Sequence, residues 1–298
     1  MYTLEPLISS VYRLSEIDLT QINAELGQLE DYDLVVEVNA EPAEYTIAAV
    51  DSGFTLVKYL GLMVGLVNVA IVTPPESSRS RFIARIINDE EALGVVAKLE
   101  EFNAAYELLD DRGILLLDGP LLTEREGDGK LRALVDKALG TGHYVLSFTK
   151  EVRLNRVINR LLKVDKPINE ASLFFTLLER FRLRHRSRGL LITTPVNLQG
   201  EVVGFYMQAH GGSPPIYVEA TGNVVKNPSV LSTVALMMSR ENYPIPLYIA
   251  DKISKVSDEL RRWFIMALLR VGSMSDVDPL LYRYVRDVLG YARGRNLY

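Results

Sequence analysis

Cysteine is absent from the sequence. Its absence excludes disulfide frameworks, zinc–thiolate sites and cysteine nucleophiles, and it fits a protein of the reducing cytoplasm. It also fits a thermophile, whose proteins contain few labile residues. Histidine is scarce as well, and no two of His143, His185 and His210 have the spacing of metal ligands. We therefore expect no zinc site.

Long uninterrupted apolar runs are also missing. The most apolar stretch, from Tyr59 to Val72, is interrupted by glycine and by Asn68. It is shorter than the roughly 20 residues that a membrane-spanning helix needs. We interpret it as buried strands and expect no contact with a membrane. Residues 1–18 show no basic start followed by an apolar block, so we expect no signal peptide.

An excess of positive charge is missing too, since the net charge is -5. A protein that only coats DNA is usually basic. An enzyme that cuts DNA can be acidic overall if its basic residues are local and its active site is rich in carboxylates, so the charge leaves a nucleic-acid substrate open. The sequence has neither the P-loop lysine motif nor the dinucleotide-binding glycine fingerprint, so an ATPase or a Rossmann oxidoreductase is disfavoured. It also lacks the Gly-x-Ser-x-Gly elbow.

Apolar residues, in contrast, are plentiful: they make up 48% of the 298 residues, enough for one large core. The periodicity of these residues predicts strands at 34–38, 45–50, 113–117, 144–148, 190–194, 202–208 and 216–219, with two more within 56–72. Helices are predicted at 17–29, 89–109, 130–139, 171–181, 229–238 and 246–270. We interpret Gly61 and Gly65 as turns or bulges of a hairpin, and Gly94 as a candidate break or bend in its helix.

This order of elements predicts an α/β fold. Successive strand–helix–strand steps build a sheet that helices cover on both faces, and three early strands in a meander match the order of RNase H-like folds. We expect an RNase H-like mixed central sheet flanked by helices, with N- and C-terminal helical additions. The chain then divides into an N-terminal extension at 1–44, a main domain at 45–270 and a C-terminal helical segment at 271–298.

Two aspartates directly follow apolar strands. Asp51 precedes Ser-Gly and Asp118 precedes Gly-Pro. The carboxyl ends of neighbouring parallel strands open onto one crevice, where clustered carboxylates suit hard divalent ions such as magnesium and manganese. Two such ions about 4 Å apart can activate water and stabilise charge during phosphodiester hydrolysis. The alternative is that both sequences are only turn signals.

A further acid is expected from the helix before the Asp118 strand. A helix packed antiparallel to that strand covers its height in roughly 11–13 residues. Counting back from the helix end favours Glu101, then Glu100, whereas Glu91 lies too far along. The alternative is an exposed, solvated Glu-Glu pair.

Asp251 and Lys150 are the remaining candidates. Asp251 lies about one turn inside a helix that begins near Pro246, where it could complete the carboxylate cluster or only interact with the helix dipole. Lys150 ends the strand after Asp118. It could orient a water or offset phosphate charge, or it could simply be exposed.

These residues resemble the motifs of NurA, an archaeal and bacterial nuclease domain that acts with the hexameric helicase-translocase HerA. The resemblance rests on Ala48–Phe54, Ile114–Leu121, Phe148–Lys150, Tyr243–Leu247 and Ala250–Asp251. The family typically shows Asp-Gly-Ser after both strands, then a lysine and a late Tyr-Pro-x-Pro-Leu stretch. Here Ser-Gly follows Asp51, and Pro120 replaces the second serine.

The resemblance implies a manganese-dependent DNA nuclease, with magnesium as a second option for the ion. It implies exonuclease action from 5′ ends, some endonuclease action on single strands, and a homodimer docked on HerA in DNA-end resection. The catalytic residues would be Asp51, Glu101, Asp118, Lys150 and Asp251, and the metal ligands Asp51, Asp118 and Asp251. The altered loops leave open a catalytically weak or inactive paralogue that serves as a DNA- or translocase-binding module.

Two basic stretches are candidates for DNA contact. In the denser one, every second residue is an arginine: Arg180, Arg182, Arg184, Arg186 and Arg188. The other has helix-like spacing and contains Arg153, Arg156, Arg160, Lys163 and Lys166. Each predicts either a phosphate-tracking rim or an exposed strand edge protected by charge. His210, before Gly211-Gly212, could approach the scissile phosphate.

The C-terminal segment is apolar and rich in tyrosine, a residue enriched at interfaces. It predicts either the interface of a homodimer or a segment that packs back on its own domain.

Overall fold

The computed structural model describes residues 34–59, 62–75, 77–87, 90–109, 113–122, 128–150, 157–162 and 169–274. The predicted helix at 17–29 and the tyrosine-rich segment beyond Met274 lie outside this part of the chain. So do most of the second basic stretch and the side chain of Glu91. Among the described helices, none is long and apolar enough to cross a membrane.

The described strands join in a single ten-stranded sheet, ordered β1-β7-β9-β10-β6-β5-β2-β3-β4, with β8 paired to β9. Strands β2, β5 and β6 are parallel to one another and the other pairs are antiparallel. The strands are β1 (Val35–Val38), β2 (Ile47–Tyr59), β3 (Leu62–Thr73), β4 (Ser77–Ile87), β5 (Ile114–Asp118), β6 (Tyr144–Thr149), β7 (Leu190–Thr193), β8 (Val196–Gln199), β9 (Val202–Gln208) and β10 (Ile216–Thr221).

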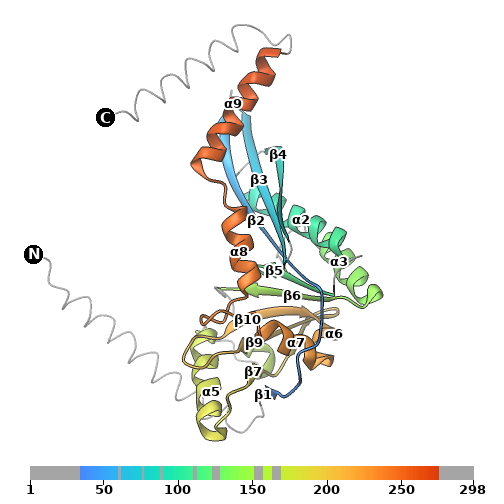
Figure 1. Ribbon diagram of the computed structural model, residues 1–298, viewed down its shortest axis with the longest axis vertical. Helices are drawn as coiled ribbons and strands as arrows, with labels where there is room; N and C mark the ends of the chain where they lie inside the picture. The colour runs from blue at the N-terminus through green and yellow to red at the C-terminus, as the bar shows by residue number, and fades with distance from the viewer. Residues whose placement is uncertain are drawn as a thin grey trace, which may run out of the picture.

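Helices pack on both faces of this sheet (Figure 1). They are α2 (Glu90–Leu108), α3 (Asp128–Thr141), α4 (Ile158–Leu162), α5 (Glu170–His185), α6 (Gly222–Lys226), α7 (Pro228–Ala235), α8 (Ile245–Ser254) and α9 (Asp258–Met274). Alternate residues of a strand point to opposite faces, so Leu115 and Leu117 join a core with α2, α3 and α5, while Leu116 joins a second core with α7 and α8. The predicted mixed sheet flanked by helices is confirmed.

The three-stranded meander differs from the prediction in its boundaries. Strand β2 does not end at Asp51 but continues to Tyr59, so the Asp-Ser-Gly sequence is no turn. Gly65 lies inside β3, where a Cβ would meet Leu93 Cδ1 at 2.3 Å. Gly65 and Gly53 allow close packing and do not turn the chain, whereas Gly61 lies outside the described residues. The third strand of the meander, β4, was not predicted because nearly all its side chains are exposed.

The helical predictions need three corrections. Gly94 does not break α2, which runs continuously from Glu90 to Leu108. The helix expected at 246–270 is two helices, α8 and α9, separated at residues 255–257. The arginine-rich stretch is no strand edge, because α5 continues to His185 and ends at Arg186 in the left-handed conformation, with φ of 52°. Strand β8 and helices α4 and α6 were not predicted.

Candidate metal centre

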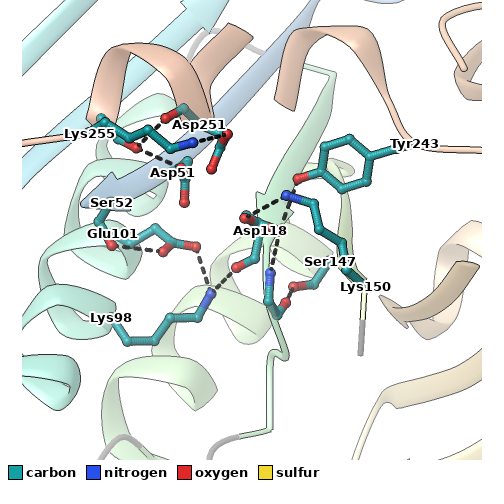
Figure 2. Close-up of polar contacts among 12 residues, drawn as sticks. Asp51, Ser52, Lys98, Glu101, Asp118, Ser147, Lys150, Tyr243, Asp251 and Lys255 are labelled. Carbon is teal, nitrogen blue, oxygen red and sulfur yellow. Dashed lines mark hydrogen bonds and ion pairs between the residues drawn. The ribbon is translucent and has the colours of Figure 1, made fainter. Parts of the chain in front are cut away.

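Three aspartates from three separate elements meet at the middle of the sheet. Strands β2 and β5 pair in parallel with Val50 opposite Leu117, so Asp51 and Asp118 come next at the same level of neighbouring strands. Asp251 extends from α8 on the face above them (Figure 2). Each contributes a carboxylate oxygen, and these three atoms lie within 4.8 Å of one another. The structure therefore brings together the three predicted metal ligands.

Helix α8 reaches this position because β2 and β3 receive its C-terminal end. Gly53 has no Cβ, and one built there would lie 2.3 Å from the backbone oxygen of Ser254. Opposite Gly53, the buried Asn68 donates from Nδ2 to the backbone oxygens of Ile253 and Ser254 at 2.8 and 3.1 Å. These bonds satisfy carbonyls that a helix end leaves without partners. The Ser254 hydroxyl then donates to Asp51 Oδ2 at 2.7 Å.

The trio carries negative charge that the protein only partly compensates. Burial raises the pKa of Asp51, and the charges of Asp118 and Asp251 raise it further, although the hydrogen bonds from Ser254 and Ser52 lower it. Lys255 Nζ lies 3.3 Å from Asp251 Oδ2, but its side chain is 60% exposed. Closely spaced, partly buried carboxylates favour a divalent cation among them, so these donors fit manganese or magnesium.

Asp118 is further held by residues on its other side. Its Oδ1 accepts hydrogen bonds from the Tyr243 hydroxyl at 2.9 Å and from the backbone N–H of Gly119 at 3.0 Å. Lys150 Nζ lies 3.7 Å from its Oδ2 and 4.3 Å from the centre of the Tyr243 ring. Burial, followed by the charge of Asp118, raises the pKa of Tyr243 above its ordinary value, so the phenol remains a neutral donor.

Of the candidate glutamates, the structure places Glu101 beside the trio. Its Oε2 accepts from the Ser52 hydroxyl at 3.1 Å, and its Oε1 lies 2.6 Å from Lys98 Nζ. Burial is the largest influence on the pKa of Glu101 and raises it to about 7 despite this lysine. Glu100 instead contacts Arg85 at 3.3 Å, on the side of α2 that faces β4. Glu101 is not among the mutually close metal-binding oxygens of the described residues.

Sequence reasoning missed Lys98, Tyr243, Ser254 and Lys255 as neighbours of the site. A lysine three residues before a glutamate is common on exposed helix faces, and nothing local marks Lys98 as buried. Tyr243 entered only as part of the family-like stretch. Ser254 had no local signal, because its partner, Asp51, is 203 positions away.

The arginine-rich stretch lies on α5 and the turn that follows it, not beside the aspartates (Figure 1). The guanidinium of Arg182 donates to the backbone oxygens of Gly189 and Gln208 at 3.0 and 3.3 Å, so its role within the chain is structural. Arg180 is half-buried, and Arg184, Arg186 and Arg188 are exposed. His210 is exposed and lies in a loop whose backbone is bonded to Asn242.

A comparison with known protein families shows to which family the chain belongs. The model of the NurA domain matches residues 45–256. The chain belongs to the NurA family. No curated protein matches the sequence. The NurA match covers all three aspartates, Glu101, Lys150 and Tyr243, and it confirms the resemblance drawn from the sequence motifs.

Solved NurA structures share the whole fold at low sequence identity. The NurA nuclease of Sulfolobus solfataricus is 15% identical, with a TM-score of 0.60, over 93% of this chain and 97% of its own. A NurA structure bound to dAMP and manganese is 10% identical, with a TM-score of 0.60, over 92% and 99%. A NurA structure with manganese is 11% identical, with a TM-score of 0.59, over 91% and 99%. At these identities the likeness shows a common fold.

Proposed function

We propose that this NurA protein is a divalent-metal-dependent deoxyribonuclease that hydrolyses phosphodiester bonds. The observation that carries the proposal is the convergence of Asp51, Asp118 and Asp251 to within 4.8 Å. Asp51 and Asp118 lie on neighbouring strands. Asp251 lies on α8, which is held against these strands by its contacts with Asn68 and Gly53. A module that only bound DNA or a translocase would not need these like charges to be held together, so the geometry favours catalysis over the non-catalytic alternative.

The three aspartates would hold the ion, with manganese proposed first and magnesium second. A bound divalent ion supplies positive charge that activates a water and stabilises the phosphorane-like transition state. The NurA structures that contain manganese and dAMP support this choice of ion and of a nucleotide substrate. The oxygen-only donor set supports it independently, because hard cations prefer such ligands.

The neighbouring side chains have distinct tasks in this proposal. Tyr243 and the backbone N–H of Gly119 orient Asp118 through its Oδ1. Lys150 is half-exposed beside Oδ2 of the same residue, so its ammonium is available to a phosphate oxygen of DNA. Glu101 supports the site from α2 through Ser52, the residue next to Asp51.

The finer features of the activity rest on the family. We propose 5′-to-3′ exonuclease action with endonuclease action on single strands, in DNA-end resection together with a HerA-type translocase. We also propose a homodimer and a cytoplasmic location. The sequence predicts DNA contacts for Arg180, Arg182, Arg184, Arg186 and Arg188. Of these we propose that Arg184, Arg186 and Arg188, which are exposed, bind the DNA.

Digestion of end-labelled linear DNA tests the proposed function. The protein should cut it with Mn2+, cut it equally or more slowly with Mg2+, and leave it intact with a chelator. Label at the 5′ end should be released as short products before label at the 3′ end. Equal cutting in chelator would reject metal dependence, and early release of the 3′ label would reject the proposed polarity.

A further inference from the structure

Lys98 extends from α2 into the site, and its ammonium is enclosed there (Figure 2). Nζ lies 2.6 Å from Glu101 Oε1 and donates to the backbone oxygen of Asp118 at 2.5 Å. It also lies 5.2 Å from the centre of the Phe102 ring. The side chain is only 16% exposed, and that of Glu101 is 3% exposed. The cation is therefore fixed between the helix glutamate and the strand that carries Asp118.

The other two lysines of the site are held much less firmly. Lys150 lies 3.7 Å from Asp118 Oδ2 with half of its side chain exposed. Lys255 lies 3.3 Å from Asp251 Oδ2 with 60% exposed. Neither donates a hydrogen bond to the backbone of the residues that the structure describes. An arriving metal ion can displace both into water, where ammonium groups are well solvated. Displacing Lys98 would leave Glu101 as a buried carboxylate without its cation, which is strongly unfavourable.

The charges of the site also indicate that Lys98 stays in place while Lys150 and Lys255 move aside. Asp51, Asp118, Asp251 and Glu101 provide four carboxylates. If Lys150 and Lys255 move aside and Lys98 remains, one divalent ion leaves these groups with a charge close to -1. A second divalent ion beside Glu101 would occupy the same space as the ammonium and would be repelled by it.

We propose that Lys98 takes the place of a second metal ion: the site binds a single divalent cation, at Asp51, Asp118 and Asp251, and the Lys98 ammonium satisfies Glu101. The inference rests on the metal site of the proposed function. It assigns Lys98 as a positioning residue, which holds Glu101 and the backbone of Asp118 in place and contributes a permanent positive charge.

The number of bound Mn2+ ions tests this directly. Isothermal titration of the metal-free full chain with Mn2+ should give one ion per chain, and electron paramagnetic resonance should show isolated Mn2+. Lys98→Met keeps a similar length but removes the charge, so Glu101 becomes free to bind metal. This variant should bind two ions per chain and show spin-coupled Mn2+ pairs. Lys98→Arg, which keeps the charge, should bind one.

A second variant keeps the test decisive if Lys98→Met does not fold. Glu101→Gln removes the carboxylate but should leave the stoichiometry at one ion, since Glu101 binds Lys98 and not metal. The double variant Lys98→Met with Glu101→Gln should also bind one. Two ions in the unaltered chain, or one ion in a folded Lys98→Met variant, would overturn the proposal.

The two proposals fail in different ways. Cleavage of DNA by a chain that binds two ions would overturn the role of Lys98 and leave the nuclease assignment standing. A chain that binds one Mn2+ as expected, yet cuts no DNA with Mn2+ or Mg2+, would overturn the nuclease assignment and leave the metal stoichiometry standing.

Discussion

Gly53 lies directly against the backbone oxygen of Ser254, so close that a Cβ on Gly53 would stand 2.3 Å from that oxygen and 3.3 Å from the Cα of Lys255. Both contact atoms belong to backbone and cannot rotate away. The contact fixes how near the end of α8 comes to β2. It therefore also fixes the height of Asp251 above Asp51 and the reach of the Ser254 hydroxyl to Asp51.

We expect Gly53→Ala to push α8 away from the sheet and to weaken Mn2+ binding by about fivefold or more, because overpacking costs about 1–3 kcal/mol and 1.4 kcal/mol is a factor of ten. Gly140→Ala is the matched control. It lies in α3, where a Cβ would have no heavy atom within 4 Å, and it should retain Mn2+ affinity. Titration calorimetry checks both, and equal Mn2+ affinity in the two variants would contradict the role of the contact.

Asp51→Asn and Asp118→Asn should each abolish cleavage while leaving the fold intact, since the amide keeps the shape but loses the charge that a shared metal ligand needs. The folded Asp51→Asn variant should be at least as stable as the parent in the absence of metal, because burial raises the pKa of Asp51 and makes its charge costly. Asp136→Asn is a control, because Asp136 is exposed on α3 and 67% accessible.

The measurements are DNA cleavage with Mn2+ and thermal unfolding with and without the ion. Addition of Mn2+ should raise the Tm of the parent and of Asp136→Asn, because the ion binds only the folded state. It should raise that of the two site variants much less. Full cleavage activity in either site variant would remove that carboxylate from the proposed metal centre.

Much of the fold was predictable because continuous apolar runs fill both cores. Strand β5 and strand β6 were found almost residue for residue, since their side chains are buried on both faces. Strand β4 was not, because its pattern is that of an exposed edge. The break between α8 and α9 was only partly visible in the sequence. Its tertiary cause is Asn68 of β3, which binds the last carbonyls of α8. Its local cause is Ser257, whose hydroxyl accepts from the Leu260 N–H at the start of α9 and which the sequence analysis did not use.

The candidate site shows the same division. Asp51 and Asp118 were found because each follows an apolar run, although Asp51 proved to lie within its strand. The geometric count along α2 selected Glu101 over Glu100, and the structure places Glu101 next to the aspartates. Lys98 has no sequence signal, because its burial comes from the packing of α2 against the sheet, where its ammonium meets the backbone oxygen of Asp118.

The stability of the metal-free protein should depend on pH through Glu101. Burial raises the pKa of Glu101 from 4.5 to about 7 in the folded state. A raised pKa means that protonation favours folding, so the contribution is complete below pH 4.5 and is lost as the pH rises through about 7. Thermal unfolding in chelator should therefore show a Tm that falls between pH 5 and pH 8. Glu101→Gln should flatten this fall, and an unchanged slope in the variant would assign the effect to other groups.

Tyr243→Phe should lower Mn2+ affinity and cleavage by about tenfold or more, since a hydrogen bond to a charged group contributes about 1.5–3 kcal/mol. The ring remains, and with it the contact of Lys150 with the aromatic face, so only the bond to Asp118 is removed. Tyr248→Phe is the control, because Tyr248 is 53% exposed on the outer face of α8. Equal losses in the two variants would show that the Tyr243 hydroxyl does not position Asp118.

The exposed arginines at the end of α5 provide the last test, which concerns the path of DNA. We expect the double variant Arg184→Glu with Arg186→Glu to bind DNA more weakly and to show a flatter dependence of binding on salt. Each lost phosphate contact means that fewer counterions are released on binding, so the slope of log K against log salt should become shallower by about 0.7–0.9 per contact.

Arg182→Ala should behave differently, because its guanidinium ties Gly189 and Gln208 together within the chain. It should lower the Tm of the protein without a specific change in the salt slope. Lys130→Glu with Arg132→Glu, two exposed changes on α3, controls for net charge. Fluorescence anisotropy of labelled single-stranded DNA across a salt series measures all three, and identical slopes for the α5 and α3 double variants would place the arginines away from the DNA.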